Sequence, residues 1–321
     1  MPSHLIPLLL FVTLSPLLPM KGAEFREIPE ETIKALKAAQ TSEQWAELMP
    51  EAEMFTYAKR GDQAMPLYFF PSQLESDAPT GVLLLFSGGA FKSGSPAGYY
   101  RHALDYSANG MAVVLVKYRG TKTDNATVLD AYRDGHAALV WVRDHAEELG
   151  IDPDKVVAGG SSAGSMIALA LATLDFLQEK GGATDGAPNG LLLYDLAMGA
   201  IASAPIEGDP MLGAEPPARW SWFSEERFGD DPKKLSPFHH LHDDLPPAAL
   251  FMGGKEKPAQ RHGAWLLFSA GTEKGADWDL HFYGAMPHGS MTGSAGWQPE
   301  VYRSVVESSL RFLRRHEFLT N

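Results

Sequence analysis

Short apolar runs alternate with amphipathic helical patterns along most of the chain. Six runs are rich in strand-forming residues and too short to be helices, and they span 82–87, 112–117, 156–160, 198–204, 248–253 and 280–283. Apolar residues recur at helical spacing over 127–150, 163–180 and 299–316. This alternation predicts an α/β fold with a mostly parallel central sheet flanked by helices.

Two further segments complete the predicted domain. Residues 54–58 and 65–70 flank a turn at Arg60-Gly61-Asp62, which predicts an antiparallel hairpin at the edge of the sheet. Residues 206–241 lack regular periodicity and are rich in proline and aromatic residues, so we interpret them as an irregular lid or cap. Because no linker divides the chain, residues 24–321 are predicted to form one domain.

The first 23 residues differ from the rest of the chain. Positions 5–18 are largely apolar, and a short polar exit follows at Lys21-Gly22-Ala23, which is typical of a secretory signal peptide. The short apolar span and its prolines argue against a stable membrane span. We therefore expect a secreted or periplasmic protein, with an uncleaved membrane tether as the alternative because no Lys or Arg precedes the apolar run.

Composition narrows the partners and the chemistry. A formal charge of −13 disfavours nucleic acid, whose phosphate backbone attracts proteins with a surplus of Lys and Arg. The chain has no cysteine, which excludes disulfides, thiolate nucleophiles and cysteine-based metal sites. His239, His240 and His242 leave two interpretations open, a metal site and, more commonly for such clusters, an ordinary loop.

The clearest chemical motif is Gly160-Ser161-Ser162-Ala163-Gly164, between a predicted strand and a predicted helix. Gly-x-Ser-x-Gly in this context holds a serine hydroxyl on a tight turn where a base can reach it. Ser162 is the predicted nucleophile. Ser161 fails on register, because a pattern centred on it needs glycine at position 163. The alternative is a glycine-rich turn with incidental serines.

A serine nucleophile also needs hydrogen-bond donors for the negative oxygen that develops during attack. Such donors are commonly the amide after the nucleophile and amides of a glycine-bearing loop after an earlier strand. In this chain they are predicted to be Ala163 together with Gly88 and Gly89, which lie in the sequence Phe86-Ser87-Gly88-Gly89-Ala90-Phe91.

Together these motifs resemble the α/β-hydrolase fold, specifically the hormone-sensitive-lipase-like esterases and the related acetyl and feruloyl esterases. The resemblance covers about residues 64–318 and includes Val116-Lys117-Tyr118-Arg119, residues 130–134, Trp141-Val142-Arg143 and residues 149–153. The oxyanion loop of these esterases reads His-Gly-Gly-Gly or His-Gly-Gly-Ala. Ser87 replaces that histidine here, so we expect altered support of the loop with its amide donors retained.

The resemblance also implies two partners for Ser162. His288, in the sequence Pro287-His288-Gly289 after the last predicted strand, looks like the family's catalytic base. Glu256 falls where these esterases have their acid, usually an aspartate. Because Glu256 stands between two lysines, a noncatalytic surface glutamate is the alternative.

The function implied by the resemblance is hydrolysis of carboxylic esters through an acyl-enzyme, without a cofactor or a metal. Small-molecule esters and acetyl esters of carbohydrates are the expected substrates. Trp220, Trp222 and Phe223 offer either an aromatic platform for such a substrate or packing for the lid. Two alternatives are a prolyl-oligopeptidase-like peptidase, whose usual propeller domain has no room here, and a noncatalytic binding protein on a hydrolase scaffold.

Overall fold

The protein is described by a computed structural model, which places residues 22–178, 186–196, 224–293 and 297–319. Its strands form a sheet in the order β1-β2-β4-β3-β5-β6-β7-β8. The pairs from β4 to β8 are parallel, whereas β1 pairs antiparallel with β2, and β2 with β4. The strands are β1 (Glu53–Arg60), β2 (Gln63–Phe70), β3 (Thr80–Phe86), β4 (Ala112–Val116), β5 (Ile151–Ser162), β6 (Gly190–Leu196), β7 (Ala248–Gly253) and β8 (Trp278–Tyr283).

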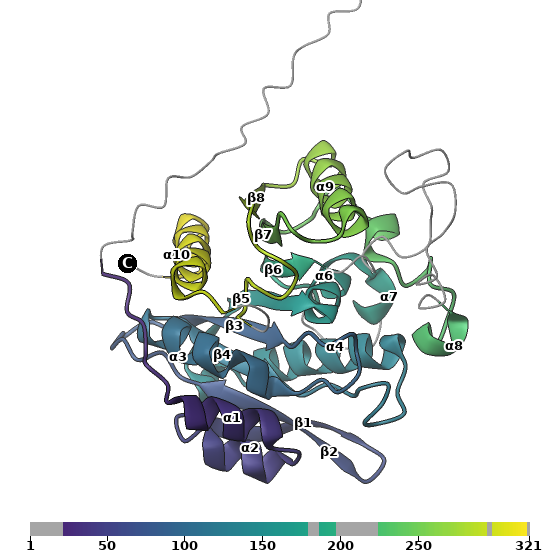
Figure 1. The fold of residues 1–321 in the computed structure, drawn as a ribbon. Coiled ribbons are helices and arrows are strands. Elements are labelled where there is room, and N and C mark those ends of the chain that lie inside the picture. The colour runs from purple at the N-terminus through teal and green to yellow at the C-terminus, as the bar shows by residue number, and fades with distance from the viewer. Residues whose placement is uncertain (1–21, 179–185, 197–223, 294–296, 320–321) are drawn as a thin grey trace, which may run out of the picture.

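Helices cover both faces of this sheet (Figure 1). Alternate residues of β3 point to opposite cores, with Val82 and Leu84 on one side and Leu83 and Leu85 on the other. One core is completed by α4 (Val128–Asp144), α6 (Ala163–Thr173) and α9 (Pro258–Glu273), and the other by α1 (Glu30–Ala38), α2 (Ser42–Leu48), α3 (Tyr100–Ala108) and α10 (Pro299–Arg315). The short elements are η1 (Pro96–Tyr99), α5 (Ala146–Leu149), α7 (Asp175–Gln178), α8 (Glu225–Phe228) and η4 (Pro237–His240).

Most elements predicted from the hydrophobic pattern are present. The hairpin β1–β2 lies at the edge of the sheet and turns at Gly61, whose φ is +60°. The helix predicted over 127–150 is divided into α4 and α5 by His145, and it ends as expected at Gly150, which is left-handed with φ +65°. The helix predicted over 163–180 is likewise α6 followed by the short α7.

The position of the sixth strand is the main difference between the predicted elements and the structure. The strand predicted over 198–204 falls outside the described residues, and the strand that pairs between β5 and β7 is Gly190–Leu196. Apolar residues run almost continuously from Leu191 through Ile206, so no polar break marks where the strand ends. Residues 1–21 of the predicted signal peptide and residues 206–223 of the predicted lid, which include Trp220, Trp222 and Phe223, also lie outside the described residues. Within the described part of the chain, no helix has the length and apolar character needed to cross a membrane.

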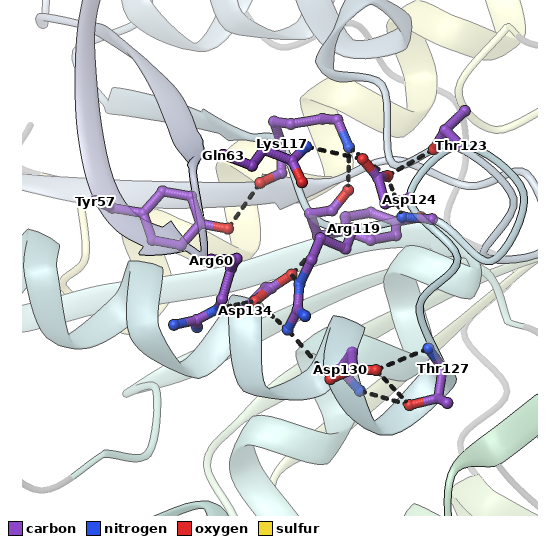
Figure 2. A network of polar contacts seen from close by, with 12 residues as sticks. Tyr57, Arg60, Gln63, Lys117, Arg119, Thr123, Asp124, Thr127, Asp130 and Asp134 are labelled. Atoms are coloured by element: carbon purple, nitrogen blue, oxygen red, sulfur yellow. Dashed lines mark hydrogen bonds and ion pairs between the residues drawn. The ribbon is translucent and has the colours of Figure 1, made fainter.

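An ion network fixes the loop after β4 to helix α4 (Figure 2). Arg119 Nε is 2.8 Å from Asp134 Oδ2, and Arg119 Nη2 is 3.2 Å from Asp130 Oδ1. Arg60 Nε, on β1, is 2.9 Å from Asp134 Oδ1. One fully buried carboxylate, that of Asp134, therefore joins the edge hairpin, the loop after β4 and helix α4.

Replacing Asp134 with asparagine is expected to lower the free energy of unfolding by about 3 kcal/mol, because two partly buried guanidinium groups lose their shared anion. Urea denaturation followed by circular dichroism measures the change. Asp62→Asn, the same substitution in the exposed hairpin turn, is the control and should stay within about 0.5 kcal/mol of the parent. A loss below about 1 kcal/mol in Asp134→Asn would show that the network contributes little to stability.

Candidate active site

Ser162 stands on the turn between β5 and α6. It is the last residue of β5, and its φ of +53° and ψ of −114° are strained for a residue with a side chain. A Cβ on Gly164 would lie 1.7 Å from the Phe86 carbonyl oxygen, and one on Gly160 would lie 2.5 Å from the carbonyl carbon of Gly164. The two glycines of the motif are therefore steric requirements of the turn, as the sequence pattern indicates.

His288 reaches Ser162 from the loop after β8. Its Nε2 atom is 3.0 Å from Ser162 Oγ, and its side chain is 34% exposed. The hydroxyl of Ser162 can thus donate to an imidazole that solvent and small molecules also reach. The structure brings together the two residues that the sequence predicts as nucleophile and base.

Glu256 completes a hydrogen-bonded chain of side chains that begins at Ser162 and continues through His288. Its Oε2 atom is 2.9 Å from His288 Nδ1, and its side chain is fully buried, so the alternative of a surface glutamate is wrong even though both flanking lysines are exposed. With Nδ1–H donating to this carboxylate, the Nε2 atom of His288 is left as the acceptor that faces Ser162.

Two glycines let the loop of Glu256 approach the loop of His288. The N–H of Gly254 donates to the Tyr283 carbonyl at 2.9 Å, and the N–H of Lys255 donates to the Met286 carbonyl at 2.9 Å. A Cβ on Gly253 would lie 2.2 Å from the Met286 carbonyl oxygen, and one on Gly254 would lie 2.4 Å from that of Gly284. This close approach fixes the loop that carries Glu256 against the loop that carries His288.

The charges around His288 favour its protonated form. Burial lowers the pKa of the imidazole, but the hydrogen bond and charge of Glu256, and then the charge of Asp195, outweigh it and raise the pKa above the usual 6.5, whereas Lys257 lowers it slightly. An imidazole with a raised pKa is a stronger base for a serine proton once it is neutral.

The predicted oxyanion loop lies against the nucleophile turn. A Cβ on Gly88 would lie 2.9 Å from the Ser161 carbonyl oxygen and 3.4 Å from Ser162 Cβ, so the loop touches the residue that it is predicted to serve. Gly89 has a φ of +108°, which favours glycine. Ala163 is the first residue of α6, and the N–H groups of a first helical turn have no acceptor within the helix.

Backbone carbonyls, and not the side chain of residue 87, anchor this loop. The Tyr118 hydroxyl donates to the Ser87 carbonyl at 2.7 Å, and the Arg227 guanidinium of α8 donates to the Ala90 carbonyl at 2.6 Å. Lys117 Nζ in turn donates to the Tyr118 carbonyl at 2.6 Å. Ser87 Oγ is buried without a hydrogen-bond partner among the described residues. The loop is therefore held through its backbone, by hydrogen bonds from Tyr118 and Arg227.

Asp195 is a residue of this site that the sequence analysis missed. It lies at the end of β6, is fully buried and has a carboxylate oxygen within 4.8 Å of the facing atoms of Glu256 and His288. No motif marks it, because it is a lone aspartate in a continuous apolar run. The only signal is chemical, since a charged residue inside a buried strand needs a reason.

The histidine cluster near Pro237 does not form a comparable group. His242 has its Nε2 atom 3.0 Å from the Ala172 carbonyl and its Nδ1 atom accepts from the Asp244 N–H, while His239 lies edge-on to Phe238. Among the described residues, the group of three whose atoms converge closely enough for a metal ion is Asp195, Glu256 and His288. Glu256 and His288, two of these three residues, are already hydrogen-bonded to each other.

Comparison with known proteins identifies the family. Residues 83–292, more than half of the chain, match the family described as alpha/beta hydrolase fold, and the chain belongs to that family. A propionate-bound esterase of the planctomycete Thermogutta terrifontis aligns with a TM-score of 0.73 and 28% identity, over 85% of this chain and 97% of that one. Esterase 2 of the same species, phosphonylated by sarin, aligns with a TM-score of 0.76 and 27% identity, over 85% and 98% of the two chains.

Curated relatives share a shorter region. Carboxylesterase 5A of sheep (Ovis aries) is 34% identical over 105 residues, which are 30% of this chain and 27% of that protein. The matched region is thus about a quarter of the length of that relative. The fold class and the resemblance to α/β-hydrolase esterases that the sequence predicts are confirmed by the family match and by the esterase structures.

Proposed function

We propose that the protein is a serine hydrolase that cleaves carboxylic esters, with Ser162 as nucleophile, His288 as base and Glu256 as acid. One observation carries the proposal, namely the continuous series from Ser162 Oγ to His288 at 3.0 Å and on to Glu256 at 2.9 Å. The nucleophile end of this series stands on a strained strand-to-helix turn, and the acid end is buried. This arrangement activates a hydroxyl that is otherwise a weak nucleophile.

In the acylation half of the proposed reaction, Ser162 Oγ attacks the ester carbonyl carbon while His288 Nε2 takes the hydroxyl proton. Glu256 stabilises the imidazolium that results and keeps its ring in the productive orientation. The amides of Gly88, Gly89 and Ala163 donate to the oxyanion of the tetrahedral intermediate. His288 then gives the proton to the leaving alcohol, and an acyl-Ser162 ester remains.

In the deacylation half, water replaces the alcohol. His288 Nε2 removes a proton from the water, whose oxygen attacks the acyl carbon within the same oxyanion site. Collapse of the second intermediate returns the proton to Ser162 Oγ and releases the carboxylic acid. Both halves use protein side chains and water, so the proposed reaction requires no added cofactor or metal.

For the substrate we propose esters of short-chain acids, acetyl esters of carbohydrates among them. Structures of the Thermogutta terrifontis esterase with propionate and with butyrate bound support a short acyl group. The carbohydrate part rests on the resemblance to acetylesterases and on the export predicted from the first 23 residues. The two alternatives named from the sequence make different predictions, since a peptidase cleaves amides and a binding protein turns over neither bond.

A substrate panel on the purified chain tests the proposal. We expect turnover of p-nitrophenyl acetate, propionate and butyrate without added metal, at least about tenfold lower kcat/KM for the octanoate ester, and release of acetate from acetylated xylo-oligosaccharides. The p-nitroanilide of acetic acid should not be hydrolysed at a comparable rate.

Every other outcome of the panel would contradict a different part of the proposal. Preference for octanoate would contradict the short acyl group, and preference for the anilide would favour the peptidase. Absence of acetate release from the oligosaccharides, with aryl esters cleaved, would contradict the carbohydrate substrate alone. No turnover of any ester would contradict the esterase.

A further inference from the structure

Asp195 lies on the strand between the two strands that lead to the nucleophile and to the acid. Its strand, β6, lies between β5, which ends at Ser162, and β7, which precedes Glu256. Ser161 is paired with Tyr194, but Ser162 is paired with Leu196, so Asp195 is the extra residue at a shift of register. Extra residues of this kind redirect a side chain, and they are common beside active sites.

The backbone of Asp195 is strained to make this possible. Its φ of +45° is unusual for a residue with a side chain. Such strain persists where the surrounding structure fixes the residue, and it is frequent at functional sites. The side chain that the strain redirects is fully buried.

The carboxylate of Asp195 contacts the residue next to the nucleophile and the residue next to the base. Ser161 Oγ, next to the nucleophile, is 3.4 Å from Asp195 Oδ2, and the N–H of Gly289, next to the base, donates to the same carboxylate. The Oδ1 atom is buried and has no hydrogen-bond partner among the described residues. Asp195 thus connects the turn of Ser162 to the turn of His288 through neighbours of both.

The groups that face Asp195 come from several elements. Glu256 after β7 and His288 after β8 lie within 4.8 Å, and Tyr99 of η1 interacts with the Asp195 charge. Burial raises the pKa of Asp195 to about 7, an effect that protonated His288 opposes and Glu256 reinforces. Lys257 lowers the pKa of His288, whereas the two carboxylates raise it. Two buried carboxylates and one imidazole this close titrate as a coupled group.

We propose that Asp195 is a positioning residue for the base: it holds the turns of Ser162 and His288 in place and, when ionised, shifts the pH at which His288 becomes neutral. The proposal deepens the function proposed above and rests on it. Asp195 does not touch the reacting atoms, and its effect passes through His288.

The sign of the effect follows from the charges. A negative charge beside His288 favours the imidazolium, so the imidazole becomes neutral only at a higher pH. Attack by Ser162 requires the neutral imidazole, and kcat/KM therefore falls as the pH decreases through the pKa of His288. Asp195 is itself ionised only at pH values near and above its pKa of about 7, so its charge acts on the upper part of the His288 titration. Removing that charge should lower the pKa of His288 and move this part of the acid limb of the kcat/KM profile to lower pH.

Asp195→Asn separates the charge from the hydrogen bonds, because the amide oxygen can still accept from Gly289 and Ser161. We expect the acid limb of kcat/KM for p-nitrophenyl acetate to move down by about one pH unit, with the plateau at alkaline pH reduced less than about tenfold. Asp195→Ala also removes the acceptor, and its plateau should fall at least about tenfold below that of Asp195→Asn. Asp62→Asn makes the same change of net charge on the distant hairpin and should leave the profile unchanged.

A measurement independent of turnover accompanies the kinetics. The imidazole proton signal of His288, assigned by its loss in His288→Gln, is titrated by NMR in the parent chain and in Asp195→Asn. The proposal predicts a lower midpoint in Asp195→Asn by about one pH unit. Equal midpoints in the two proteins would overturn it, as would equal plateaus of the Ala and Asn variants. A shifted midpoint in a chain that cleaves no ester would support the role of Asp195 and contradict the esterase.

Discussion

Replacing Ser162 with alanine is expected to lower kcat for p-nitrophenyl acetate by about 10⁵–10⁶-fold, close to the loss seen when a catalytic serine is removed from other hydrolases. The reason is that no other hydroxyl is held both at 3.0 Å from His288 Nε2 and on the strained turn, among the residues that the structure describes. Folding should be unaffected, because the substitution removes one partly exposed oxygen atom. Thermal denaturation of the variant checks this point.

Ser161→Ala provides the matched control. Ser161 is adjacent in sequence, yet its hydroxyl is buried and lies 3.4 Å from Asp195 rather than beside the base. Loss of this long hydrogen bond should reduce kcat by less than about tenfold. If Ser161→Ala were inactive and Ser162→Ala retained turnover, the nucleophile would be misassigned.

Replacing Glu256 with glutamine is expected to lower kcat by about 10⁴-fold, the loss that follows when the acid of a serine triad is converted to its amide. The glutamine amide can donate to His288 Nδ1, which favours the tautomer with its proton on Nε2, where it cannot accept from Ser162. The amide also leaves the imidazolium without a compensating charge in a buried environment. Steady-state kinetics with p-nitrophenyl acetate, at several pH values, measures the effect.

Two further variants define the role of Glu256. Glu256→Asp keeps the charge but is one methylene short of the 2.9 Å contact, so we expect activity between those of the parent and Glu256→Gln. Glu273→Gln, at the exposed end of α9, is the matched control and should behave as the parent. A rate for Glu256→Gln within about tenfold of the parent would contradict its role as the acid.

The sequence predicts the fold class and proposes Ser162, Glu256 and His288 because buried strands and the nucleophile turn leave local signals. The buried strands are short apolar runs, and the nucleophile turn requires glycine at positions 160 and 164 for reasons that the structure makes explicit. The resemblance to α/β-hydrolase esterases implies His288 and Glu256, because these esterases carry the acid and the base on the loops after their last strands.

The remaining features depend on contacts between distant residues. Helix α9 was not predicted because its polar first turn and Gly271 obscure the pattern, and that glycine is required by Trp278, whose ring lies 2.3 Å from where a Cβ would be. Asp195 was missed because its role arises from a shift of register against β5, which no spacing in the sequence encodes. The burial of Glu256 between two exposed lysines likewise depends on the hydrogen-bonded loops after β7 and β8.

Covalent labelling of the nucleophile tests the central claim most directly. The Thermogutta terrifontis esterase has been phosphonylated by sarin and phosphorylated by paraoxon, which motivates an organophosphorus probe. The purified chain is treated with a fluorophosphonate, and peptide mass spectrometry locates the adduct. We predict one adduct per chain, on Ser162, with none in Ser162→Ala and strongly slowed labelling in His288→Gln. A parent chain that stays unlabelled, or an adduct on Ser161 or any other residue, would contradict the proposed nucleophile.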